Sequence, residues 1–92
     1  MGTIRVQLPA ALMPLAGDEA ALDLGGEKVG DVLHSLSIRH AAVGRRILTR
    51  GGELRRHVNI FLDEEDIRHL QGLDTPVAGY QWLIIVPSVA GG

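Results

Sequence analysis

The sequence contains no cysteine, which excludes disulfides, thiolate metal sites and a cysteine nucleophile. Aromatic residues are nearly as scarce, with one Phe, one Tyr and one Trp among 92 residues. The net charge is −2, so the chain lacks the basic excess with interleaved aromatics that is typical of nucleic-acid binders. We therefore expect no nucleic-acid partner.

Long hydrophobic runs are also missing. No stretch approaches the ~18 apolar residues of a membrane span, and the N-terminus lacks the basic-then-apolar pattern of a signal peptide. We expect a cytoplasmic protein without a membrane partner. Lysine is almost absent as well: eight arginines accompany a single lysine, Lys28, so only one position could carry a conjugate on a lysine.

The first third of the chain has the pattern of a β-hairpin followed by a helix. Residues 3–8 alternate polar and apolar, as does the shorter stretch 20–24, and Gly17-Asp18 between them is a turn signal. Apolar residues then recur at helical spacing over 27–40, which predicts an amphipathic helix. A short second helical turn is expected over about 42–48.

The remainder predicts strands. Residues 55–62 form the clearest inner strand, with Val58, Ile60 and Leu62 on one face. An acidic turn over 63–66 precedes a possible short strand at 67–70, and the final strand covers about 81–86.

This order of elements predicts an α+β fold in which one main helix packs on one face of a mixed four- to five-stranded sheet. Parallel pairing of the first and last strands at the sheet centre would make it the β-grasp arrangement of ubiquitin. The predicted domain covers residues 1–87, and residues 88–92 form a thin tail that ends in Gly91-Gly92. Glycines have no Cβ, so such a tail can enter a narrow slot.

The chain resembles the MoaD/ThiS family of ubiquitin-like sulfur carriers over nearly its full length. Four segments carry the resemblance, namely residues 54–62 (LRRHVNIFL), 65–68 with its Asp66-Ile67-Arg68 motif, 72–76 (GLDTP) and 84–92, which ends in Val-Ala-Gly-Gly. The segment of residues 58–68 looks most like the branch that serves cysteine biosynthesis. One departure is that family members place an acidic, glycine-containing turn before the last strand, where this chain has residues 79–82 (GYQW).

The resemblance implies that the chain is a protein substrate and not an enzyme. An E1-like adenylyltransferase of the MoeB/ThiF type would join the Gly92 carboxylate to the α-phosphate of ATP. Sulfur from a separate donor would then displace AMP and leave a Gly92 thiocarboxylate, which would pass its sulfur to a biosynthetic enzyme such as a cysteine synthase. No cofactor would be bound, ATP would be used by the partner, and Gly91 would thread the tail.

A docking surface is also expected on the sheet. If Leu83 and Ile85 face the helix, their neighbours on the last strand face the other way and an exposed apolar patch results. The alternative is that a loop or the second helix covers these side chains. The expected partner-binding residues of the sheet and tail are Phe61, Trp82, Ile84, Pro87, Val89 and Ala90.

Other constellations are weaker. The four histidines are scattered, so no metal site is expected, and the acidic turn lacks the spaced ligands of a calcium loop. The pairs Arg45-Arg46 and Arg55-Arg56 are interpreted as solvated faces or rim contacts. Three functions remain open: a sulfur carrier for cysteine, molybdopterin or another sulfur-containing product, a modifier conjugated through Gly92 to lysines, and a non-activated binding module.

Overall fold

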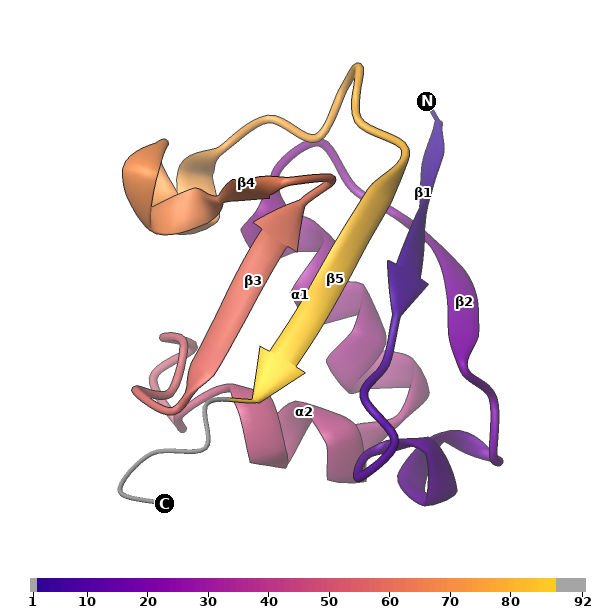
Figure 1. The fold of residues 1–92 in the computed structure, drawn as a ribbon. Helices are drawn as coiled ribbons and strands as arrows, with labels where there is room; N and C mark the ends of the chain where they lie inside the picture. Colours follow the sequence, from indigo (N-terminus) through magenta and orange to yellow (C-terminus); the bar gives the residue numbers. More distant parts are fainter. Residues whose placement is uncertain (1, 88–92) are drawn as a thin grey trace.

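The computed structural model describes residues 2–87 and builds one mixed five-stranded sheet (Figure 1). The strands are β1 (Thr3–Gln7), β2 (Ala21–Gly25), β3 (Val58–Leu62), β4 (Glu65–Asp66) and β5 (Trp82–Pro87), in the order β2-β1-β5-β3-β4. β1 and β5 run parallel at the centre, and the other neighbours are antiparallel. The expected β-grasp arrangement is confirmed.

The N-terminal hairpin follows from the period-2 pattern. Ile4 and Val6 on β1 pair with Leu24 and Leu22 on β2, and all four side chains are buried. The connection holds a 3-10 helix, η1 (Met13–Ala16), and turns back at Gly17-Asp18, where both residues have positive φ. Asp tolerates this left-handed conformation better than most non-glycine residues, so the turn is compatible with the sequence.

Two helices, α1 (Val29–Arg39) and α2 (Ala41–Ile47), cover one face of the sheet (Figure 1). The Asp31 carboxylate accepts hydrogen bonds from the backbone N–H groups of Glu27 and Lys28, which satisfies donors at the start of α1. The second helix is a full element and lies on the same side as α1. It crosses α1 closely because Gly44, which has no side chain, lies against Ser37.

The strand over residues 55–62 is shorter than expected. The Val58 N–H donates to the Arg55 carbonyl in a turn, so β3 begins only at Val58. The short strand expected at 67–70 is wrong, because Ile67–His69 form a 3-10 helix, η2, and the strand lies two residues earlier, in β4. A further 3-10 helix, η3 (Gly72–Asp74), follows before β5.

The core lies between the sheet and the helices. It joins β-strand side chains such as Ile60, Leu62 and Leu83 to Val32, Leu33 and Leu36 of α1, all of them essentially inaccessible to water. Burial of such side chains contributes roughly 1.5–3 kcal/mol each. The helical layer thus occupies one face of the sheet, and the other face is available for a site.

Candidate functional site

The last strand divides its side chains between the two faces of the sheet. Leu83 and Ile85 are 0% and 3% exposed and point to the helical layer. Trp82 and Ile84 point the other way and are half-buried, and Val86 is 37% exposed. Neither helix covers this face, so the structure places these residues as the sequence predicted.

Strand register brings Phe61 to the same face. Phe61 of β3 lies opposite Ile84 of β5, which in turn pairs with Gln7 of β1. The four side chains of Phe61, Trp82, Ile84 and Val86 are hereafter called the open sheet face. All four come from the neighbouring antiparallel strands β3 and β5, whose backbones pair along the whole of β3.

An ion pair flanks the open sheet face on the β1–β2 side. The Arg5 guanidinium lies 3.5 Å from the Asp23 carboxylate, and its carbon lies 5.7 Å from the centroid of the Trp82 ring. This distance permits a cation–π contact. Sequence reasoning missed Arg5, although its alternation with Ile4 and Val6 already assigned it to the outer face.

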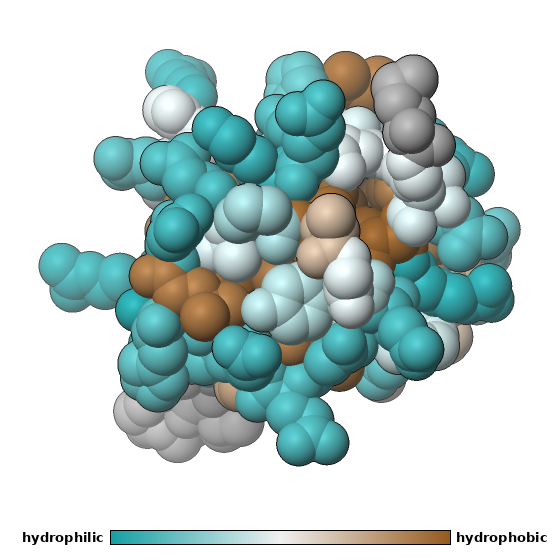
Figure 2. Space-filling model, turned by 90° about the horizontal axis from the view of Figure 1, so that it is seen from above, coloured by the Kyte–Doolittle hydropathy of each residue, from teal (hydrophilic) through white to brown (hydrophobic). Residues whose placement is uncertain are grey.

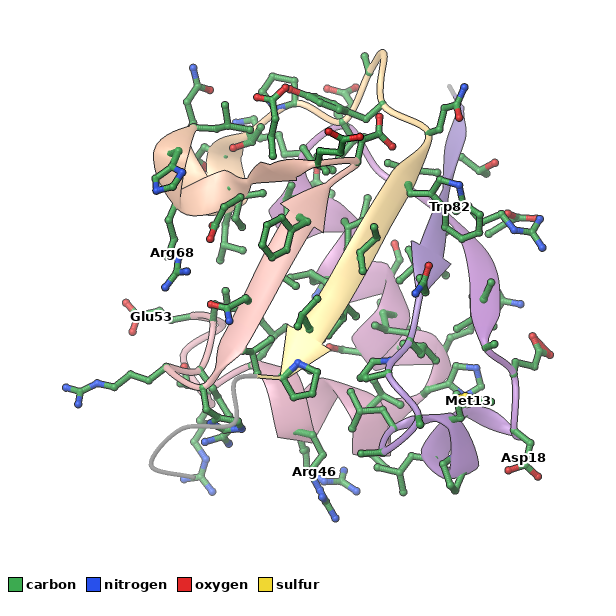
Figure 3. The ribbon with its side chains drawn as sticks, in the orientation of Figure 1. Met13, Asp18, Arg46, Glu53, Arg68 and Trp82 are labelled. Carbon is green, nitrogen blue, oxygen red and sulfur yellow. The ribbon has the colours of Figure 1, made fainter. Side chains whose placement is uncertain are left out.

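A second ion pair flanks the face on the β4 side, opposite Trp82 (Figure 3). Asp66, which pairs with Phe61 across the strands, accepts hydrogen bonds from the Arg68 backbone N–H at 2.9 Å and from Nη2 at 2.7 Å. Nε of Arg68 lies 3.2 Å from both carboxylate oxygens. The side-chain hydrogen bonds, and then the backbone one, hold the pKa of Asp66 at about 2 against the ordinary 3.8.

The acidic turn between β3 and β4 fixes the start of β5. Asp63 has a positive φ of 54°, and its carboxylate accepts hydrogen bonds from the N–H groups of Gln81 at 3.2 Å and Trp82 at 2.9 Å. Tyr80 donates a hydrogen bond to Glu65, and desolvation together with that carboxylate raises the pKa of its hydroxyl. Residues 79–82 lack the acidic turn that family members carry before the last strand. Acidic side chains nevertheless contact these residues, and they come from β4 and from the turn that precedes it.

The strand that bears the site ends at Pro87. Pro87 is exposed and lies opposite Val58 at the start of β3, at the end of the sheet near α2. The predicted tail residues Val89, Ala90, Gly91 and Gly92 lie outside the described residues. The structure therefore defines the point from which the tail leaves the body.

Other kinds of site find no support in the described part of the chain. Within residues 2–87, His, Asp and Glu side chains nowhere gather in a group of three that could hold a metal ion. No helix within that range is long and apolar enough to cross a membrane. Seen from the end at which β5 begins, the molecule shows mostly hydrophilic residues with small hydrophobic areas between them (Figure 2).

A sheet with parallel first and last strands at its centre, covered by helices on one face, defines the chain as a ubiquitin-like β-grasp protein. The profile of the ThiS family matches residues 6–92, so the chain belongs to that family.

Relatives agree with this assignment. The sulfur carrier protein CysO of Mycobacterium tuberculosis is 32% identical over 91 residues, covering 97% of this chain and 98% of the relative. The solution structure of small archaeal modifier protein 1 from Methanosarcina acetivorans has a TM-score of 0.87 at 38% identity, covering 100% and 98% of the two chains. In the crystal structure of the Amycolatopsis orientalis BexX/CysO complex, the matching chain has a TM-score of 0.85 at 31% identity, covering 97% and 99%. The family thus includes both carriers and modifiers.

Proposed function

We propose that this chain is a sulfur carrier, a protein substrate whose terminal Gly92 carboxylate is activated and loaded by partner enzymes. The observation that carries the proposal is the family match along residues 6–92, which includes the terminal glycine pair. The identity with CysO over nearly the whole of both chains supports the same function.

The chemistry requires activation because a carboxylate is a poor acyl donor. A Gly92 carboxylate oxygen attacks the α-phosphate of ATP, held by an E1-like enzyme of the MoeB/ThiF type, and pyrophosphate leaves. A donor then supplies sulfur at the oxidation level of sulfide. The sulfur attacks the acyl carbon, the bond to the AMP oxygen breaks, and the products are AMP and a Gly92 thiocarboxylate. The chain itself supplies no general base or metal to these steps.

The folded domain would position Gly92 in the partner enzyme. The tail of five residues after Pro87 spans at most ~17 Å when extended, which is enough to carry Gly92 into a cleft while the folded domain stays outside. The open sheet face supplies an apolar docking surface on the strand that ends at Pro87, and its Trp and Phe are residues that often anchor interfaces. Pro87, Val89 and Ala90 would form the apolar neck that leads into the partner.

The test is adenylation of the Gly91→Ala variant by the E1-like enzyme of the same organism, measured by pyrophosphate exchange. A Cβ at position 91 widens the thread, so we expect exchange to fall at least ~100-fold, as for other errors of placement at a reacting centre. Gly2→Ala is the matched control, because its new methyl group would meet no atom within 4 Å. Gly2 precedes β1, which is parallel to β5 and therefore begins at the end of the sheet opposite Pro87. Equal exchange by the two variants would refute the threading role.

The proposed destination of the sulfur is cysteine, through a cysteine synthase that accepts the thiocarboxylate. The support is the similarity to CysO and the resemblance of residues 58–68 to the cysteine branch. The thiocarboxylate sulfur would displace the leaving group from the β-carbon of an activated serine held by such a synthase. Hydrolysis of the acyl bond in this adduct should then release free cysteine and restore the Gly92 carboxylate. Sulfur delivery to a molybdopterin precursor alone would overturn this destination.

The alternative function is protein modification, in which the same adenylate ends in an isopeptide bond to a lysine. The observation that favours it is the 38% identity to small archaeal modifier protein 1. Immunoblots of cell extracts separate the two functions, because a modifier produces a ladder of conjugates that disappears when Gly92 is deleted. A carrier produces no such ladder.

A further inference from the structure

The charges of this chain are segregated along the sequence. Residues 45–56 contain five of the nine basic residues and a single acid, Glu53, which gives this segment a net charge of +4. The rest of the chain has four basic and ten acidic residues, a net charge of −6. The five arginines, hereafter the arginine cluster, are Arg45, Arg46, Arg50, Arg55 and Arg56.

Hydrogen bonds tie the arginine cluster to the point where the tail leaves the body. Pro87 pairs with Val58, and the Val58 N–H donates to the Arg55 carbonyl. Arg55 in turn donates two hydrogen bonds of 2.9 Å, one from its backbone N–H to the Ile47 carbonyl and one from Nε to the Arg45 carbonyl. The end of α2 and the start of β3 are therefore joined beside Pro87, and Figure 3 shows Arg46 beyond the end of β5.

The guanidinium groups of this cluster have no carboxylate partners in the described chain. The ion pairs within residues 2–87 are those of Arg5 and Arg68, and neither involves the cluster. Arg45, Arg46, Arg50 and Arg56 are exposed. Arg45, Arg50 and Arg55 also border an open hollow of about 570 Å³, together with His34 and Thr49. Within residues 2–87 this surface is therefore positively charged and concave, and no carboxylate pairs with it.

We propose that the arginine cluster docks the acidic rim of the protein cleft that receives the tail. Such a partner must lie against the body around Pro87, where the cluster is. Complementary charges accelerate encounter and fix orientation, and an acidic side chain of the partner can enter the hollow. This inference rests on the proposed function and adds the chemistry of the partner surface to it.

Two other anions fit less well. The nucleotide that meets Gly92 lies up to ~17 Å beyond Pro87, so the arginines of the body face the rim of the cleft and not its phosphates. Nucleic acid binders combine basic grooves with aromatic side chains on which bases stack. Here Phe61 and Trp82 lie on the open sheet face, and no aromatic residue occurs among residues 45–56.

The test compares adenylation kinetics of Arg46→Glu and Lys28→Glu with the E1-like enzyme of the same organism. Each substitution changes the net charge from −2 to −4. Lys28 follows β2 at the end of the sheet opposite Pro87, since β2 is antiparallel to β1 and β1 is parallel to β5. Arg55 is left intact because it caps α2. Arg46→Lys retains the charge and serves as the rescue variant.

We expect KM of Arg46→Glu to rise about fivefold at about 0.05 M salt with kcat unchanged, and this difference to shrink below about twofold at about 0.5 M salt, where screening is stronger. Lys28→Glu and Arg46→Lys should match the wild type. An unchanged KM in Arg46→Glu overturns the docking role and leaves the proposed function intact. Absence of adenylation in the wild type overturns both.

A nucleic-acid role is tested in the same variants with a fluorescent single-stranded RNA oligonucleotide. Fluorescence anisotropy should show no binding by the wild type at micromolar protein. RNA binding that Arg46→Glu abolishes, with adenylation KM unchanged, would overturn the assignment to a protein partner.

Discussion

The Asp66–Arg68 pair allows a quantitative prediction about stability. The carboxylate of Asp66 is only 10% exposed, accepts the backbone N–H of Arg68 and receives its guanidinium in a bidentate contact. The pKa of Asp66 is about 2, against 3.8 ordinarily. A shift of this size corresponds to an upper limit of about 2.5 kcal/mol. The Arg68 side chain is 64% exposed, so water and salt screen the pair, and we expect about 1 kcal/mol.

The pH dependence follows from the direction of the shift. Because the folded-state pKa lies below the unfolded-state pKa, the unfolded chain takes up the proton first as the pH falls. The stabilisation is therefore complete above about pH 5 and is lost between about pH 4 and pH 2. Asp66→Asn tests this, because its amide oxygen still accepts the Arg68 backbone N–H, whereas the charge and the second oxygen that accepts from the guanidinium are removed.

The assay is urea unfolding of the wild type and Asp66→Asn at a series of pH values, with Asp74→Asn as the control for an exposed carboxyl. We expect Asp66→Asn to lower the free energy of unfolding by about 1 kcal/mol at pH 7 and by almost nothing near pH 2. Other carboxyls titrate in both proteins, so they cancel in the difference. A difference that is constant over the whole pH range would refute the charge-based explanation.

Three further predictions concern the helix packing, the open sheet face and the start of β5. Gly44→Ala places a methyl group 2.7 Å from Cβ of Ser37, so we expect a loss of about 1–3 kcal/mol in urea unfolding, and no loss would contradict the close helix contact. Ile84→Thr should raise the adenylation KM about tenfold. Ile38, a helix residue that is 73% exposed, provides the control, and Ile38→Thr should leave KM unchanged. Equal KM values for the two variants would show that the open sheet face is not part of the interface. Asp63→Ala should lower the urea midpoint of unfolding more than Asp63→Asn does. Only Asn retains both a hydrogen-bond acceptor for the Trp82 N–H and tolerance of a positive φ. The reverse order would contradict the role of Asp63 in fixing the start of β5.

Much of the fold was predictable because local patterns and tertiary contacts agree. The alternation at Ile4 and Val6, and again at Val58 to Leu62, assigns faces correctly, and the apolar spacing over 29–36 assigns the buried stripe of α1. The same alternation on β5 predicted that Trp82 and Ile84 share a face with Phe61. What remained open was whether anything covers that face, since the side of the sheet on which α2 packs depends on the path of the whole chain.

The segment after β3 could not be predicted because side-chain hydrogen bonds decide it. The sequence predicts a short strand over residues 67–70, but the Asp66 carboxylate accepts a hydrogen bond from the Arg68 N–H at the start of a 3-10 turn. The Asp66-Ile67-Arg68 motif, which carried part of the resemblance, is thus a structural cap beside Phe61. Asp63 likewise looks like part of a solvated turn, yet it binds the start of β5 eighteen and nineteen residues later in the chain.

The arginine cluster could not be predicted from the sequence. Arg45-Arg46 and Arg55-Arg56 are separate pairs in the sequence, and each alone is typical of a solvated face. Only the hydrogen bonds of Arg55 to the end of α2, and the pairing of Val58 with Pro87, bring the two pairs together near Pro87. Long-range register of this kind has no local signature.

Sulfur loading is tested most directly by the intact mass of the protein after incubation with its E1-like enzyme, ATP and a sulfide source. A sulfur carrier should show a mass increase equal to the replacement of one oxygen by one sulfur. Fragmentation should locate the increase to Gly92, and deletion of Gly92 should abolish it. An unchanged mass, under conditions in which the enzyme hydrolyses ATP to AMP with this protein present, would contradict the central claim.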